Sequence, residues 1–407
     1  MLKEKILNII NKDILRKVFI FLSFPFVIFI LLYFDFNFLG FYLYKLVKIF
    51  IDNLYDFLNG INAVQNMSEV VKSFVFHGIF KSVAIFFYVL PYIVVWFFIL
   101  NVMKECGYLK NVANATKIIF KFTGVSSSDI YALLSGFGCC ACVHFETKNF
   151  KEKLLFYFLI PFFSCSAKFP VYILLAAVFA PNHREVIVFL LYILGVLIGF
   201  ILTSIINILW VKNVSVDNFE YDSQFKIPSF KNILVQSLFQ VQNFVKKTFI
   251  WIFISLILIW FLLNFNLNLN FIQKSTENIL MFLGRLIFPL FQSFGVENSR
   301  ISSIIFVGFF SKEAVSIAFP SLFSNMEEIA YNSKRISMLA CMLFVLIYTP
   351  CFAMIANIKR ELGVKYALLL PILQCTFAFG FAFITYLIGK YIYIHFMFKP
   401  IKRIFIC

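Results

Sequence analysis

Charged side chains are scarce in this chain of 407 residues. Asp, Glu, Lys and Arg make up 14% of it, whereas apolar residues make up 62%. A soluble domain is about one quarter charged and about half apolar. The composition therefore excludes a set of soluble domains, which the length alone would allow. It predicts an integral membrane protein whose surface contacts a lipid bilayer.

Acidic residues are the rarer charged class, at 20 against 36 basic residues, which leaves a formal net charge of +16. No block of consecutive Lys and Arg forms a nucleic-acid-binding arm, so we expect no nucleic-acid partner. In a chain this apolar, basic residues between apolar runs instead mark loops that stay in the cytoplasm. Those that precede the first apolar run place the N-terminus on the cytoplasmic side of the cell membrane.

Signatures of catalysis are also absent from the sequence. It contains no Gly-x-x-x-x-Gly-Lys-Ser/Thr phosphate loop, no His-Glu-x-x-His zinc motif and no Gly-x-Ser-x-Gly nucleophile turn. The nine cysteines lie mostly in apolar segments of a chain far longer than small disulfide-stapled proteins, so we expect reduced thiols. We therefore expect no enzymatic activity of the chain's own and no cofactor.

Apolar runs long enough to cross a bilayer recur along the chain. The fold class they predict is an all-α polytopic membrane protein with about seven transmembrane helices. The expected crossings lie near residues 18–34, 79–103, 154–180, 185–210, 248–266, 337–357 and 366–394.

Two glycine-punctuated stretches between the crossings predict re-entrant or broken helices. Residues 118–125, followed by Gly136-Phe137, resemble residues 286–296, followed by Gly308-Phe309. The number of crossings between them places their entries on opposite sides of the membrane. Such inverted repeats hold a substrate site between them near the midplane.

The repeats suggest a division of the chain into five parts. These are residues 1–78 (N-terminal segment, first crossing and external amphipathic stretch), 79–212 (first repeat), 213–247 (cytoplasmic linker), 248–395 (second repeat) and 396–407 (tail).

A cluster of thiols lies in the first of these stretches, at Gly136-Phe-Gly-Cys-Cys-Ala-Cys142. Cys139, Cys140 and Cys142 are followed by His144. Thiolate and imidazole groups suit borderline and soft transition metals, and a helix broken within a membrane marks a substrate path. The spacing lacks the second ligand pair of a structural zinc site. The alternative is that these cysteines only fill apolar space.

Cys165 and Cys351 occupy similar settings in the two halves of the chain. Cys165 lies between Pro161 and Pro170, and Cys351 follows Pro350. A proline frees the carbonyl group four residues before it, so we expect oxygen acceptors near each sulfur. The alternative is a proline kink with a cysteine that only packs.

Lys312-Glu313 interrupts a run of the chain that is otherwise nearly uncharged. An intramembrane carboxylate is costly and is therefore usually paired or functional. Glu313 either pairs with Lys312 or Lys168, or acts as a cation relay or gate. Lys168, if not paired, snorkels to the interface or binds an anionic headgroup.

These motifs together resemble the membrane domain of the ferrous iron transporter FeoB family, over about residues 80 to 390. The Pro-Phe-x-Ser-Cys-Ser-Ala-Lys/Arg-x-Pro-Val-Tyr element is highly specific. The motifs are Glu105-Cys-Gly-Tyr108, Gly136-Phe-Gly-Cys139, Ile160-Pro-Phe-Phe-Ser-Cys-Ser-Ala-Lys-Phe-Pro-Val-Tyr172, Gly308-Phe-Phe-Ser-Lys-Glu313, Tyr348-Thr-Pro-Cys351 and Arg360-Glu-Leu-Gly363.

The resemblance implies a permease for Fe²⁺, as transported substrate, built from two gate-type repeats. Cys139, Cys165 and Cys351 match the motif cysteines of the family, and we expect them to line the path. Glu313 would compensate charge. Cys140, Cys142 and His144 would be auxiliary ligands.

Two departures from the family qualify what the resemblance implies. Cys140 and Cys142 stand where the family usually has Asn and Pro, which adds thiols and alters the ligand set. The N-terminal GTP-binding domain of the family has no counterpart in this sequence. Either a separate polypeptide supplies it, or transport proceeds without GTP, or the protein has diverged in its substrate. A separately encoded GTP-binding protein and a second copy of the chain are the protein partners left open. The alternative functions are a gate-repeat transporter of nucleosides or another solute, and a membrane scaffold for a separate GTPase.

Overall fold

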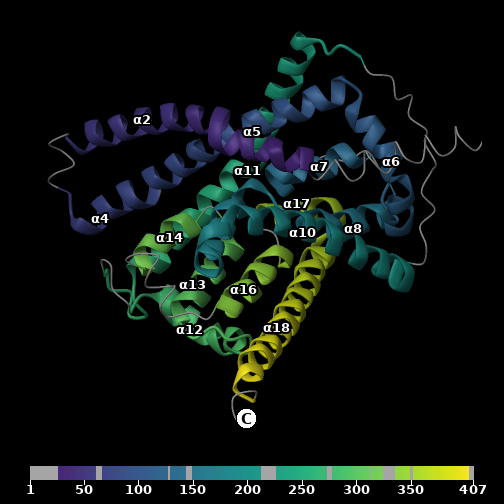
Figure 1. The fold of residues 1–407 in the computed structure, drawn as a ribbon. Coiled ribbons are helices and arrows are strands. Elements are labelled where there is room, and N and C mark those ends of the chain that lie inside the picture. The colour runs from purple at the N-terminus through teal and green to yellow at the C-terminus, as the bar shows by residue number, and fades with distance from the viewer. Residues whose placement is uncertain are drawn as a thin grey trace, which may run out of the picture.

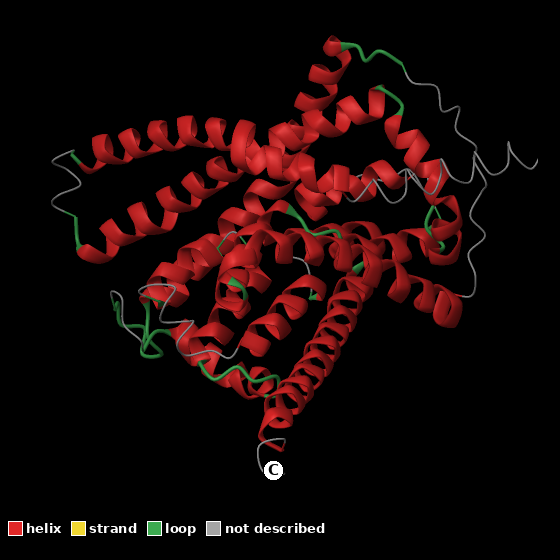
Figure 2. Ribbon diagram, viewed as in Figure 1, coloured by secondary structure: helices red, strands yellow, loops and turns green. Residues whose placement is uncertain are grey.

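The computed structural model describes residues 26–60, 67–126, 129–143, 149–211, 226–272, 277–312, 314–323, 335–348 and 352–402. Within these ranges the chain is mostly helical, with short loops between the helices, and forms no strand (Figure 2). A single antiparallel bridge joins Phe265 to Phe271 in a loop. The predicted all-α fold is confirmed.

Six helices in the described ranges are long and apolar enough to cross a membrane. Two further helices, Phe150–Lys168 and Val171–Phe179, are bent by 78° at a break and together count as a seventh span if they cross as one. The prediction of about seven crossings, including a broken one, is therefore confirmed. The six are Phe26–Asn59, Glu69–Glu105, Arg184–Val211, Phe230–Asn264, Arg335–Leu362 and Val364–Ile392.

Several helices extend beyond the crossings that the sequence predicted, because polar residues at helical spacing continue the apolar runs. The first described helix continues through η1 (Asp35–Leu39) and α2 (Gly40–Asn59), and α11 (Phe230–Asn264) begins well before residue 248. On the left of Figure 1, α2 forms an arm with α4 (Glu69–Ser73), which continues through η2 (Phe74–Phe80) into α5 (Lys81–Glu105).

The two glycine-punctuated stretches fold alike. In the first, α6 (Tyr108–Thr123) precedes α7 (Ile130–Cys139), and in the second, α12 (Ile279–Gln292) precedes α13 (Ser299–Phe310). Both connections pass through a glycine with a positive φ, Gly124 at 68° and Gly295 at 84°. A fully buried valine follows each glycine. The similarity seen in the sequence is therefore matched by a similar local fold.

The centre of the body is α16 (Arg335–Ile347). About four-fifths of the most apolar window in its span is buried, against half or less in the other spans. It packs against α9 (Phe169–Phe179) and α18 (Val364–Lys402), while α5 packs along α11. The remaining helices surround this centre: α8 (Phe150–Leu159), α10 (Arg184–Ile206), η8 (Asn207–Val211), α14 (Val315–Leu322) and α17 (Phe352–Leu362).

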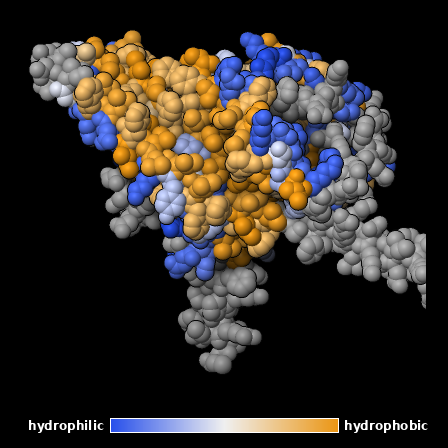
Figure 3. Space-filling model, turned by 90° about the horizontal axis from the view of Figure 1, so that it is seen from above, coloured by the Kyte–Doolittle hydropathy of each residue, from blue (hydrophilic) through white to orange (hydrophobic). Residues whose placement is uncertain are grey.

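The outer surface carries many large apolar side chains. Phe50, Phe57, Trp210 and Leu286 are each more than 60% exposed. Seen from above, apolar side chains cover much of the molecule, and hydrophilic ones gather towards its ends (Figure 3). An apolar belt of this extent suits contact with lipid rather than with water.

Replacing Gly295 with alanine should destabilise the second helical pair. A Cβ there would lie 2.6 Å from Ser337 Oγ and would also meet the ring of Tyr386, and a left-handed residue other than glycine costs about 1–2 kcal/mol. Thermal unfolding of the purified protein in detergent measures the effect. Gly380→Ala is the control, because that helical glycine has nothing within 4 Å of an added Cβ, and it should gain up to about 1 kcal/mol. Equal stability of the two variants would contradict the prediction.

Candidate functional site

The break between α8 and α9 is built by residues 160–168. A 3₁₀ turn at Ile160–Phe162 ends the first helix, an extended stretch follows, and a second 3₁₀ turn at Ser166–Lys168 leads into α9. Pro170 lies in the first turn of α9, where its missing N–H is not needed. It therefore starts a helix, and the extended stretch between the two turns carries Cys165.

The thiol cluster lies where α7 ends. Cys139 has an extended backbone, with φ −150° and ψ 114°, and Cys140–Cys142 form a 3₁₀ turn. The Gly-Phe-Gly sequence before it permits close packing: a Cβ on Gly136 would lie 2.7 Å from Ile160 Cδ1, and one on Gly138 would meet the ring of Trp96. The absence of these side chains places the end of α7 directly against the break after α8.

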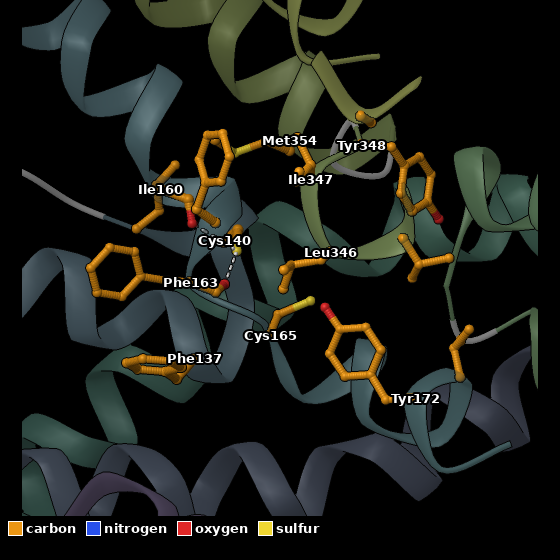
Figure 4. Packing of buried hydrophobic residues seen from close by; sticks show 14 of the residues in the cluster. Phe137, Cys140, Ile160, Phe163, Cys165, Tyr172, Leu346, Ile347, Tyr348 and Met354 are labelled. Carbon is orange, nitrogen blue, oxygen red and sulfur yellow. Dashed lines mark hydrogen bonds between the residues drawn. The ribbon is translucent and has the colours of Figure 1, made fainter. Parts of the chain in front are cut away.

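Cys140 and Cys165 meet at this junction. The Cys140 thiol donates to the carbonyl of Gly136 at 3.3 Å and lies 3.4 Å from the carbonyl of Phe163 and 3.6 Å from that of Ile160. The Cys165 side chain lines the same small cavity as the Cys140 thiol. Figure 4 shows the two sulfur atoms among Phe163, Leu346 and Tyr172. Thiols from two separate breaks thus lie side by side.

A small cavity opens beside the two thiols. The cavity volume, about 20 Å³, suffices for one water or one ion. Its polar side chains are those of Cys139, Cys140, Cys165, Ser166 and Lys312. Ser166 also donates to the carbonyl of Gly138 at 2.8 Å, which joins the two breaks. The remaining lining residues are Ile93, Gly138, Ala141, Pro161, Ala167 and Phe244.

The second helical pair reaches the same cavity from the other side. After α13, Ser311 is extended, with φ −157° and ψ 131°, as Cys139 is after α7. Lys312, which follows Ser311 as Cys140 follows Cys139, is buried and lines the cavity. Its Nζ lies 5.2 Å from the centre of the Tyr348 ring. The cavity therefore lies between corresponding helix ends of the two units.

Lys168 does not snorkel to the interface, as one reading of the sequence expected. It is fully buried, and its Nζ donates to the carbonyls of Pro161 at 3.1 Å and Leu346 at 2.7 Å. Both carbonyls lie where a helix stops, so they lack helical partners and accept from the ammonium instead. Lys168 thereby fastens the break after α8 to the end of α16.

The predicted ligands divide into two groups. Cys139, Cys140 and Cys165 come together at the cavity. Glu313, Cys351 and His144, and the side chain of Cys142, lie outside the described residues. Within the described part of the chain, no group of three or more His, Cys, Asp or Glu side chains is placed to hold a metal ion.

Carbonyl acceptors near Cys165 and Cys351, freed by the prolines beside them, stay a prediction. The carbonyl of Leu346, four residues before Pro350, accepts from Lys168, and the acceptors around Cys140 belong to Gly136, Ile160 and Phe163. Ile160 and Phe163 lie at the break after α8, where the Ile160 carbonyl also accepts from the Phe163 amide at 3.0 Å, whereas Gly136 lies in α7.

Two features of the site were not found from the sequence. One reading of the sequence paired Lys312 with Glu313, which lies outside the described residues. The place of Lys312 in the cavity lining depends on how the two helical units pack. A buried cluster of amide and hydroxyl groups next to the cavity was missed because its members are single polar residues on three distant helices, Asn101, Tyr131, Ser237 and Gln240. An amide within an apolar helix, such as Asn101, was the available signal.

Comparison with known proteins places these motifs in a wider context. The model of the Gate family, described as nucleoside recognition, matches residues 86–179 and 245–365. A Fe(2+) transporter FeoB of Staphylococcus aureus (strain MSSA476) is 26% identical over 353 residues, which are 84% of this chain and 52% of the relative. Those of Methanocaldococcus jannaschii and Helicobacter pylori are each 25% identical and cover 84% and 93% of this chain, and 53% and 65% of their own lengths. The chain thus spans about half to two thirds of the length of these relatives. No solved structure matches it.

Lys168→Met should destabilise the junction between the two broken helices. The substitution leaves the carbonyls of Pro161 and Leu346 buried without a donor, at about 1–3 kcal/mol for each orphaned group. Thermal unfolding in detergent measures the loss, and Lys359→Met, at an exposed lysine of α17, is the control. A melting temperature of Lys168→Met equal to that of the control would contradict the role of Lys168.

Proposed function

Because this chain belongs to the Gate family and is similar over most of its length to the membrane portion of FeoB transporters, we propose that it carries Fe²⁺ across a membrane. The observation that carries the proposal is the meeting of Cys140 and Cys165 in a cavity between two helix breaks. The relatives are named for Fe²⁺, a borderline cation that accepts thiolate, imidazole and oxygen ligands. The cavity offers sulfur and, around it, carbonyl oxygen.

The incomplete ligand set suits passage rather than storage. A structural metal site encloses its ion with four protein ligands, whereas two or three thiols leave positions for water. The buried ammonium of Lys312 lies beside the same space and opposes a resident cation. An ion would therefore be coordinated briefly and released.

The remaining predicted ligands complete the proposed path. Cys351 stands in the second half where Cys165 stands in the first, and Glu313 directly follows Lys312. We assign Cys351 to the path and Glu313 to charge compensation, with Cys142 and His144 as auxiliary ligands. Import into the cytoplasm follows if the basic loops lie on that side. A separately encoded GTP-binding protein and self-association stay proposals for partners.

Nucleoside transport is the second candidate, since the family is described by nucleoside recognition. A cavity with room for one water favours an ion over a nucleoside. Nucleoside carriage would depend on hydrogen-bonding amides and would not require the thiols. A membrane scaffold for a separate GTPase would require neither.

Uptake of radiolabelled Fe²⁺ by cells that express single Cys→Ser variants tests the proposal. Cys139→Ser, Cys140→Ser, Cys165→Ser and Cys351→Ser should each lower uptake about tenfold or more, because a lost ligand weakens metal sites by that order. Competition by unlabelled Mn²⁺, Zn²⁺ and Co²⁺ then ranks the ions.

Two cysteines outside the cavity provide matched controls. Cys341 is fully buried in α16 and does not line the cavity. Cys341→Ser therefore buries a hydroxyl, as the cavity variants do, but leaves the cavity unchanged. Cys106 is the residue directly after α5, and a serine there can keep the hydrogen bond to the carbonyl of Met103. Both variants should retain uptake. Wild-type Fe²⁺ uptake in all four cavity and path variants would refute the thiol path, and thiol-independent uptake of a labelled nucleoside would favour the second candidate.

A further inference from the structure

A buried polar cluster joins three helices beside the thiol cavity. Asn101 on α5 donates to Ser237 Oγ at 2.9 Å and to Gln240 Oε1 at 3.0 Å, both on α11. The hydroxyl of Tyr131 on α7 donates to Asn101 Oδ1 at 3.0 Å and contacts the Gln240 amide. Asn101 and Ser237 are almost wholly buried. The cluster presents amide, phenol and hydroxyl oxygens inside the membrane-spanning body.

The registers of the three helices place the cluster one to two helical turns from the cavity. On α5, Asn101 follows the cavity-lining Ile93 by about two turns, or about 12 Å. On α7, Tyr131 precedes Gly138 by about two turns, and on α11, Gln240 precedes Phe244 by about one turn. Spacings of four, seven and eight residues stay on one face of a helix. All three helices therefore put the cluster on the same side of the cavity.

Beyond the cluster, the polar line continues to the end of α5. Gln236 Nε2 donates to Glu105 Oε1 at 3.1 Å. Lys104 Nζ lies 4.6 Å from the centre of the Tyr131 ring. Lys104 is exposed and Glu105 is partly exposed, so this end of the line reaches the surface.

We propose that Asn101, Tyr131, Ser237 and Gln240 form a second, oxygen-lined station for the transported cation, between the thiol cavity and Glu105. The proposal deepens the function proposed above and rests on it. An ion that leaves the thiols would otherwise cross packed apolar side chains, at a desolvation penalty of several kcal/mol. Four side-chain oxygens in place of waters lower that penalty. Hydrogen bonds between membrane helices contribute little to stability on average, so helix packing alone gives little reason to bury four such groups.

Apolar substitutions of similar size test the station. Asn101→Leu and Gln240→Met should lower Fe²⁺ uptake per molecule about tenfold. Binding of Cd²⁺ by the purified protein, followed by sulfur-to-metal charge-transfer absorbance, should stay at the wild-type level, because the thiols are untouched. Ser73→Ala is the matched control: it removes another helix-to-helix hydrogen bond, from Trp260 Nε1 at 3.3 Å, and should leave uptake unchanged.

The two apolar substitutions could lower uptake by impairing folding, so Gln240→Glu provides a second test with a polar side chain. The change retains the size and an acceptor oxygen of the side chain and adds a negative charge, which should lower the apparent KM for Fe²⁺ and slow turnover. A role in packing alone would not produce that split.

Uptake per molecule at the wild-type level in Asn101→Leu and Gln240→Met, with uptake still lost in Cys165→Ser, would overturn the station and leave the thiol path intact. An unchanged KM in Gln240→Glu would overturn it as well. Full uptake in both the station and the cysteine variants would instead refute the proposed function itself.

Discussion

The site depends on one constraint: a helix that stops inside an apolar body leaves backbone groups that need partners. At the break after α8, Lys168 donates hydrogen bonds to the carbonyls of Pro161 and Leu346, and Ser166 donates to that of Gly138. The Cys140 thiol donates to the carbonyl of Gly136. Because these side chains satisfy the backbone, the chain can keep two thiols and a small polar cavity where continuous helices would have packed closed.

The charge around the cavity follows from the same arrangement. Lys312 lines the cavity, and Lys168 is hydrogen-bonded to the carbonyl of Pro161, which also lines it. A positive charge on Lys312 favours the thiolate form of the cysteines but opposes a divalent cation. A path of this kind binds its ion weakly, as transport requires, and a polar exit such as the cluster around Asn101 then decides how readily the ion leaves.

Much of the fold could be predicted from the sequence because its signals are local. The length of the apolar runs predicted the crossings, and the stretch between Pro161 and Pro170 predicted the broken helix. Gly124 and Gly295 indicated the two corresponding turns. The first and last residues of the helices were less predictable, because polar residues at helical spacing extend α2 and α11 beyond the apolar runs. The backbone partners of Lys168 were not predicted for a related reason, since they include Leu346, far along the chain.

By itself, the sequence determined that this is a helical membrane protein with two similar broken units and thiols at the breaks, because composition, period and helix breakers act over a few residues. The tertiary structure decided which groups share a space. It brought Cys140 beside Cys165, placed Lys312 against them from the other unit and gathered Asn101, Tyr131 and Gln240 from three helices. These contacts depend on the close packing of distant segments, permitted at Gly136 and Gly138 by the absence of a side chain, and no local pattern encodes them.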